Sequence, residues 1–189
     1  MIPTPDEARK LWVAHHLPEY KKRHSQLVAD LAEYFSREFE DKGIPIRTDL
    51  LLAGALLHDI DKNIPHKNGE VHPDTGVRIL RDAGMDEVAG LVATHPLHAI
   101  LDPTIAPKSW EEKLLFLVDK MVKQEIISVD ERFSSWQKES LLKNEQEILD
   151  KSYPEVKKLE DGIMTVLTKS PADVIKSCKE SIMKKGGSV

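Results

Sequence analysis

The sequence contains very little cysteine. Cys178 is the only cysteine in 189 residues, which excludes an intramolecular disulfide and a zinc site built from several thiolates. The amino-terminal segment also lacks the apolar core and the small-residue cleavage pattern of a secretory signal. Together these two absences predict a cytoplasmic protein.

Long hydrophobic runs and an excess of positive charge are also missing. The longest apolar run, residues 51–57, is far shorter than the roughly 18 residues needed to cross a bilayer. Lys and Arg total 27 against 32 Asp and Glu, and this net charge of −5 argues against nucleic-acid binding through bulk charge. We therefore expect no membrane partner and no nucleic acid. The length suits one domain, or one domain with an appendage.

What the chain does contain is helical periodicity. Apolar residues recur at spacings of three and four, and Gly, Pro and capping residues separate the periodic segments. Capping-box patterns start helices at Thr4 and Ser109. No alternating run is long enough to predict a strand, so the predicted fold class is all-α. After the first helix, the predicted helices cover residues 18–42, 48–58, 73–84, 86–95 and 109–127, with amphipathic segments at 141–149, 156–167 and 174–182 and loops at 60–72 and 96–108.

Four polar residues lie where this pattern expects apolar ones. His24 shares a helical face with three aliphatic residues, and His58 and Asp59 end the apolar run. Asp119 lies inside the segment LLFLVDKMV, where a buried carboxylate without a partner costs about several kcal/mol. Each alone has an ordinary explanation, such as a hydrogen-bonded core histidine or a solvent-facing carboxylate. One shared cation explains all four more economically, because imidazole and carboxylate are normal ligands of first-row divalent metals.

In their order and context, these residues resemble the HD superfamily of metal-dependent phosphohydrolases. The family pattern is a helix-borne His, an adjacent His-Asp pair and a distant Asp, which here are His24, His58, Asp59 and Asp119. HDIDK at residues 58–62 resembles the family's common HDIGK, and the resemblance covers roughly residues 20 to 130. It implies an all-α HD-domain helical bundle with a divalent transition metal, either Mn, Fe, Co, Ni or Zn, at its centre.

The sequence departs from the family pattern at Asp61, where Gly is usual. Aspartate adopts glycine's left-handed backbone conformation less readily, although it tolerates it better than most residues do. The extra carboxylate adds negative charge near the metal, where it could tune the choice of substrate. We expect the site to persist despite this change.

Two more histidines bear on the number of metal ions. His72 and His95 fall where the two-metal branches of the superfamily have additional ligands; these branches include symmetrical diadenosine tetraphosphate hydrolases and cyclic-dinucleotide phosphodiesterases. The resemblance implies one ion, and a second if these two histidines bind, with Asp59 bridging the pair. Without a metal role they would be exposed loop histidines. The complete predicted ligand set is His24, His58, Asp59, His72, His95 and Asp119, with His98 as a further candidate; His15, His16 and His66 are predicted to be surface residues.

The resemblance implies that the protein hydrolyses a phosphomonoester, a phosphodiester or a phosphoanhydride. Asp59 and Lys62 are the predicted catalytic residues, and Lys62 and Arg78 are the predicted contacts to substrate phosphate. Otherwise Lys62 would be solvated and Arg78 would lie on the polar face of its helix. The expected substrate is a small phosphorylated molecule, by resemblance a nucleotide. Deoxynucleoside monophosphates, dinucleoside polyphosphates, cyclic nucleotides and alarmones all stay open.

Two other functions fit the same residues. A non-catalytic HD module would sense a nucleotide, and an HD-type di-iron oxygenase would use the same ligands with iron and oxygen. We divide the chain into an HD-domain core at residues 1–130 and a C-terminal helical extension at 131–189. The extension is expected to pack on the core or to form the surface of a homodimer.

Overall fold

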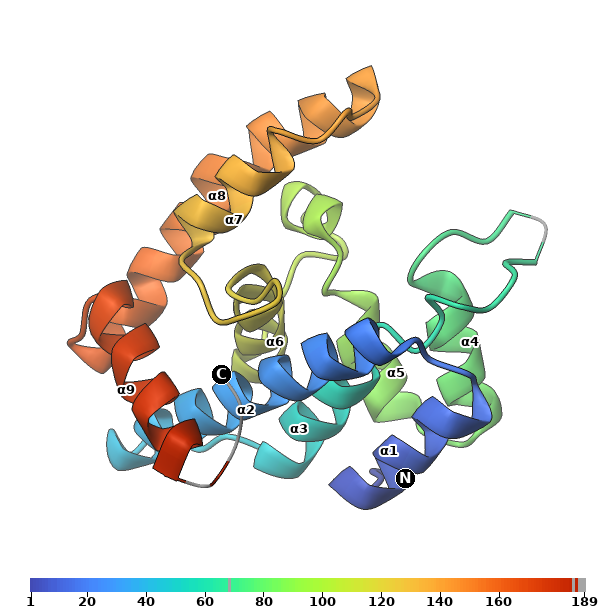
Figure 1. Ribbon diagram of the computed structural model, residues 1–189, viewed down its shortest axis with the longest axis horizontal. Helices are drawn as coiled ribbons and strands as arrows, with labels where there is room; N and C mark the ends of the chain where they lie inside the picture. The colour runs from blue at the N-terminus through green and yellow to red at the C-terminus, as the bar shows by residue number, and fades with distance from the viewer. Residues whose placement is uncertain (68, 185, 187–189) are drawn as a thin grey trace.

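A computed structural model describes residues 1–67, 69–184 and 186 of the chain. This part of the protein is all-α, as predicted, and has no β-strand (Figure 1). Its elements are α1 (Pro5–Ala14), α2 (Glu19–Asp41), α3 (Thr48–Leu57), α4 (Asp74–Asp82), α5 (Asp86–Ala93), the 3₁₀-helix η1 (Leu97–Leu101), α6 (Trp110–Lys120), α7 (Val129–Trp136), α8 (Lys143–Leu167) and α9 (Pro171–Lys184).

Side-chain caps determine where several helices begin. Capping boxes form at Thr4 and Ser109, as predicted: each hydroxyl accepts a hydrogen bond from a backbone N–H three residues on, and the Glu there accepts one from the cap's own N–H. A third capping box, Ser128 with Glu131, starts α7. The sequence reading missed this helix, although the capping signal is present.

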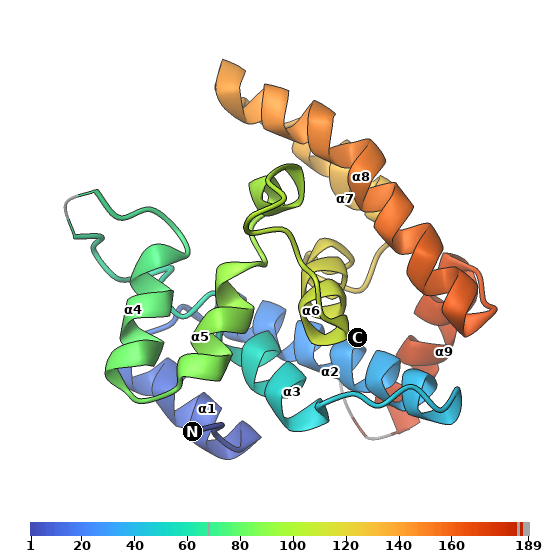
Figure 2. The ribbon, with the colours of Figure 1, turned by 180° about the vertical axis from the view of Figure 1, so that it is seen from behind.

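The centre of the bundle is α3, whose sequence TDLLLAGALL is apolar on almost every side. Such a helix is stable when other elements cover it all round, and here α1, α2, α5 and α6 pack around it (Figures 1 and 2). A Cβ atom at Gly54 would lie 2.5 Å from Leu91 Cδ2 of α5, so the missing side chain lets these helices pack closely. This packing holds the end of α3, where His58 and Asp59 follow, in the interior.

The predicted helix at 109–127 is wrong in its last third. α6 ends at Lys120, and the next residues form a turn in which Val122 and Ile126 make an isolated antiparallel bridge. Met121, Val122 and Ile126 are all fully buried. A turn that faces the core has the same apolar composition as a buried helix, and short apolar runs do not separate the two.

In the C-terminal part, by contrast, the observed helix is longer than the predicted segments. The segments predicted at 141–149 and 156–167 belong to one continuous helix, α8, which passes through Pro154. Proline removes one helical hydrogen bond, and the packing of α8 against η1, α6 and α7 offsets that loss. The loop predicted at 96–108 also contains the short helix η1.

Described parts of the predicted extension contact the rest of the bundle. α8 packs on η1 and α6, and α9 runs beside α2 (Figures 1 and 2). Residues 185 and 187–189 of the extension lie outside the described part. The domain boundary at residue 130 stays a prediction, and α7 spans it.

Within the described ranges, none of the helices combines the length and the apolar character required of a membrane-spanning segment.

Candidate metal centre

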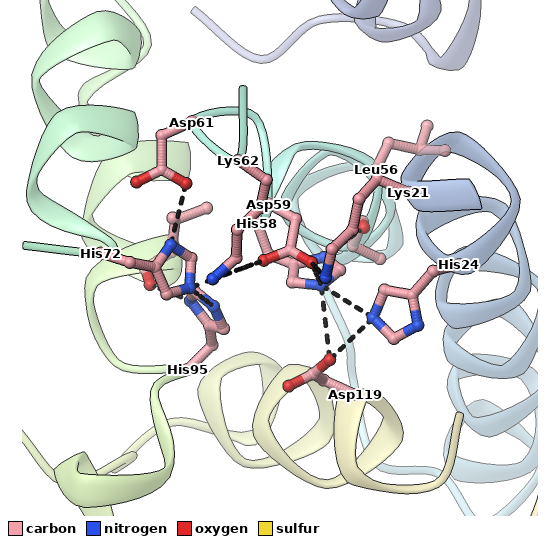
Figure 3. A network of polar contacts seen from close by, with 12 residues as sticks. Lys21, His24, Leu56, His58, Asp59, Asp61, Lys62, His72, His95 and Asp119 are labelled. Atoms are coloured by element: carbon pink, nitrogen blue, oxygen red, sulfur yellow. Dashed lines mark hydrogen bonds and ion pairs between the residues drawn. The ribbon is translucent and has the colours of Figure 1, made fainter. Parts of the chain in front are cut away.

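Six predicted ligands from separate elements converge beside the end of α3 (Figure 3). They form two clusters, and within each cluster the candidate ligand atoms all lie within 4.8 Å of one another. Cluster 1 consists of His24, His58 and Asp119, and cluster 2 consists of Asp59, His72 and His95. α2 contributes His24, α6 contributes Asp119, and the other four residues follow α3, precede α4 or follow α5.

Cluster 1 is closely packed around Asp119. Its Oδ1 lies 3.0 Å from His24 Nε2 and 3.4 Å from His58 Nε2, and the two imidazole nitrogens are 3.3 Å apart. Burial alone would raise the pKa of the Asp119 carboxyl. The Lys120 ammonium and hydrogen bonds from His24 and His58 instead hold that pKa well below its usual range. The carboxylate is therefore ionised and available to a cation.

Cluster 2 brings together His72, which precedes α4, and His95, which follows α5. Their Nε2 atoms lie 3.0 Å apart, and His72 Nε2 lies 3.5 Å from Asp59 Oδ1. His95 is almost completely buried. Burial lowers the pKa of its imidazole well below the usual value, and the neighbouring His58 and His72 lower it further. His95 is therefore neutral, which is the form that binds a metal.

Asp59 lies between the two clusters. Its Oδ2 is 3.6 Å from His58 Nε2 in cluster 1, and its Oδ1 is 3.5 Å from His72 Nε2 in cluster 2. Burial would raise the pKa of this carboxyl, but His58 and the Lys21 and Lys62 ammonium groups lower it strongly. One carboxylate thus faces imidazole nitrogens of both clusters.

Hydrogen bonds at the far side of three imidazoles fix which nitrogen faces the clusters. His58 Nδ1 lies 2.8 Å from the Ala55 carbonyl oxygen, and His95 Nδ1 lies 2.6 Å from that of Val92. A carbonyl oxygen only accepts, so each Nδ1 donates, and the lone pair of either ring lies on Nε2 whenever that ring is neutral. Cluster 2 then has two lone pairs facing each other across 3.0 Å. That arrangement suits a cation between them, since metal–nitrogen bonds of about 2.0–2.1 Å place adjacent ligand atoms about 3 Å apart.

Asp61, the departure from the family pattern, supports His72 from behind. Its side chain is buried, and Oδ1 accepts a hydrogen bond from His72 Nδ1 at 2.8 Å (Figure 3). Oδ2 accepts a second hydrogen bond, from the Gly76 N–H at 3.4 Å. Burial would raise the Asp61 pKa, but the hydrogen bond from His72 lowers it below its usual value. The carboxylate thus orients the ring and directs Nε2 into cluster 2, in the manner of outer partners of metal-bound histidines.

Three lysines surround the clusters. Lys21 Nζ lies 2.7 Å from Asp59 Oδ2, and Lys62 Nζ lies 3.7 Å from Asp59 Oδ1. Lys120 is buried; its ammonium contacts the His95 carbonyl oxygen and lies 2.8 Å from Asp119 Oδ2. Sequence reasoning found Lys62 but missed the other two. Lys21 could have been found, because it lies three residues before His24 on the same helix.

A cleft of about 380 Å³ opens onto both clusters. Its lining includes Lys62, for which the phosphate contact stays a prediction, and His98, which is exposed and belongs to neither cluster. Sequence reasoning missed Arg132 and Trp136 of α7, which also line the cleft. They follow the last predicted ligand by more than ten residues, on a helix that was not expected.

Some predicted residues are not brought to the site. Arg78 does not line the cleft; its guanidinium Nε donates to Glu70 Oε1 at 2.6 Å, so the structure gives this residue a different partner. His16 and His66 are exposed and His15 is half-buried. All three lie outside the two clusters.

A helical bundle with two adjoining His/Asp clusters at its centre is the architecture of a metal-binding helical protein. The family model for the HD domain matches residues 22–123, more than half of the sequence, and the chain belongs to this family of metal-dependent hydrolases. The uncharacterized protein MJ0778 of Methanocaldococcus jannaschii is 25% identical over 148 residues, which cover 72% of this chain and 81% of that protein. No solved structure matches the chain significantly.

Proposed function

We propose that this protein is a two-metal phosphohydrolase that acts on a small phosphorylated molecule, with a nucleotide as the expected class. The main support is the pair of adjoining clusters with Asp59 between them. Two cations held about 3.5–4 Å apart are a recurrent means of clamping the attacking and leaving oxygens of a phosphoryl group. The ligand set of imidazole and carboxylate suits Mn, Fe, Co, Ni or Zn.

Divalent cations bound by the clusters would supply Lewis acidity toward a water molecule and a phosphoryl oxygen. The protein's own part is to hold Asp59 and Asp119 ionised and Nε2 of His95 unprotonated. The lowered pKa values of both carboxyls and of His95 serve that purpose. Asp61 and the Ala55 and Val92 carbonyls keep three rings in the orientation that binds.

Lys21 and Lys62 are the proposed phosphate contacts on the open side. Both ammonium groups now contact Asp59. Cations bound by Asp59 would compete with them for its oxygens and repel them, which leaves both lysines available to the negative oxygens of a substrate. The Lys62 side chain is 31% exposed and borders the cleft, so it can reach a ligand without unfolding its surroundings.

The size and charge of the cleft support a small anionic substrate. A volume of about 380 Å³ lies within the range of small-molecule sites. The chain carries a net charge of −5, yet the cleft is lined by Lys21, Lys62, Lys120 and Arg132. Positive charge is thus concentrated at the clusters, which favours a phosphorylated metabolite over a nucleic acid or a membrane surface.

The proposal is tested by loading the purified protein with each of the five metals and assaying a panel of phosphomonoesters, phosphodiesters and nucleotide anhydrides. We expect hydrolysis of at least one nucleotide, reduced about 100-fold or more in Asp59→Asn, because this change weakens both clusters. The control is His66→Ala, which alters an exposed histidine outside the clusters and should keep wild-type activity.

Two results would contradict this proposal. A metal-loaded protein that hydrolyses nothing on the panel, but whose melting temperature a nucleotide raises, would be a sensor module. Oxygen consumption by the iron-loaded protein with an organic substrate would instead identify an oxygenase.

A further inference from the structure

Arg132 differs from the other cations of the cleft because no carboxylate holds it. Lys21 and Lys62 contact Asp59, and Lys120 contacts Asp119 at 2.8 Å. Among the described residues, by contrast, the Arg132 guanidinium has neither a hydrogen-bond partner nor an ion-pair partner, and its Nε is buried. A buried donor without a partner is destabilising, and more so when it is charged, so this arrangement calls for a ligand.

Aromatic packing holds the Arg132 guanidinium in place. Its Cζ lies 4.4 Å from the centre of the Trp136 ring, one helical turn further along α7. That ring meets Phe133 edge-on, with the two centres 5.2 Å apart, and Phe133 is buried. Stacking on an aromatic face leaves the edges of a guanidinium free to donate. The N–H donors of the guanidinium thus belong to a short helix whose first turn is held by the Ser128 capping box.

The position of Arg132 favours an anion that is bound partly by the metal clusters. The residue lines the cleft together with His24, Asp59 and Asp119. It also lines a neighbouring hollow of about 720 Å³, whose other lining residues include Lys21, Arg23 and Lys123. A guanidinium matches the geometry of two phosphate oxygens, which it can bind in parallel.

We propose that Arg132 is a substrate-binding residue that grips a phosphate group of the substrate, and that Trp136 positions it. This inference rests on the proposed function and deepens it. It adds a contact from α7, a helix outside the region of the HD family match at 22–123. Substrate recognition would then depend on a segment of this chain that the shared domain does not supply.

The test uses the full-length, metal-loaded protein and two probes, inorganic phosphate and methylenediphosphonate, a diphosphate analogue that hydrolysis does not cleave. Affinity is measured by calorimetry, and metal content by elemental analysis, for wild type, Arg132→Ala, Arg132→Lys and Trp136→Leu. Lys138→Ala is the matched control, because it removes an exposed cation just beyond α7.

We expect Arg132→Ala to weaken the binding of at least one probe about tenfold or more with unchanged metal content, since a charged hydrogen bond is lost. Arg132→Lys should recover part of the affinity, because it keeps the charge but not the two parallel donors. Trp136→Leu should have an intermediate effect, and Lys138→Ala none.

Unchanged affinity of Arg132→Ala for both probes would overturn the inference, as would a loss of metal together with affinity, which would show a structural role. If Arg132→Ala does not fold, Arg132→Lys decides by the same criteria. A wild-type protein that binds the probes through Arg132 but hydrolyses nothing would refute the proposed reaction and leave this inference standing. If the protein hydrolyses a substrate but neither probe affinity nor KM depends on Arg132, the proposed reaction stands and this inference is refuted.

Discussion

At the scale of single residues, the candidate centre depends on which nitrogen of each histidine is free. His58 and His95 donate from Nδ1 to backbone carbonyls, and His72 donates from Nδ1 to Asp61. In the neutral form, which binds metal, all three therefore present an Nε2 lone pair to the clusters. These orienting contacts come from the last turns of helices and from one buried carboxylate, so the ring orientations are set before any ligand arrives.

The first prediction concerns Asp61. Asp61→Ala removes the acceptor that orients His72, so we expect cluster 2 to bind its metal about 10–100-fold more weakly while cluster 1 is unaffected. Calorimetric titration with Mn or Zn would show two binding steps in the wild type and a weakened second step in the variant. Asp82→Asn, an exposed change at the end of α4, should leave both steps unaltered. Two unchanged steps in Asp61→Ala would show that the carboxylate does not support a metal ligand.

The second prediction concerns pH and His95. The folded-state pKa of this imidazole is far below 6.5 because the ring is buried and lies beside His58 and His72. As pH falls through about 6.5, the unfolded chain takes up a proton there and the folded chain does not, so stability falls with pH. Between pH 7 and 5, metal-free wild type should lose about 2 kcal/mol more of its free energy of unfolding than His95→Gln does. Urea titrations in the presence of a chelator measure this, and an equal loss in both proteins would contradict it.

At the scale of elements, α7 is the segment that connects the extension to the cleft. This helix starts with a capping box and is only about two turns long, yet both Arg132 and Trp136 of the cleft lining belong to it. α6, by contrast, provides Asp119, which is half-buried and directly follows five fully buried residues, 114–118. Both helices begin with the same type of cap, which allows their roles to be separated by matched changes.

The third prediction uses these two caps. Ser128→Ala and Ser109→Ala each remove a side chain that accepts from a backbone N–H, and each should lower stability by about 1 kcal/mol. Only Ser128→Ala should also weaken phosphate binding, because α7 holds Arg132. Thermal unfolding and phosphate calorimetry provide the two measurements. Equal phosphate affinity in both variants would show that α7 does not contribute to the site.

The boundaries that sequence reasoning missed share a physical cause. The apolar residues after Lys120 fill the core from a turn rather than from a helix, and composition does not report backbone direction. Pro154 predicts a break, but tertiary packing keeps α8 continuous. By contrast, the starts at Thr4 and Ser109 were predictable because capping is a local interaction.

At the scale of the whole molecule, one buried helix organises the site. α3 is covered on all sides, and the residues that follow it enter the interior between α2, α5 and α6. Four ligands could be predicted from polar residues that break an apolar face, because burying them without a partner is costly. His72 and His95 could be predicted only through the family resemblance, since both belong to loops whose path the sequence does not specify. Arg132 was missed because its place depends on how α7 packs beside the cleft.

The central claim is tested most directly by the ratio of bound metal to protein, measured by elemental analysis after loading with Mn, Fe, Co, Ni or Zn and exhaustive removal of free metal. The account predicts two ions per chain for at least one of these metals. His72→Ala should retain one ion, because cluster 1 is complete without it, and His24→Ala should retain the ion of cluster 2. A wild-type protein that binds none of the five metals would contradict the account.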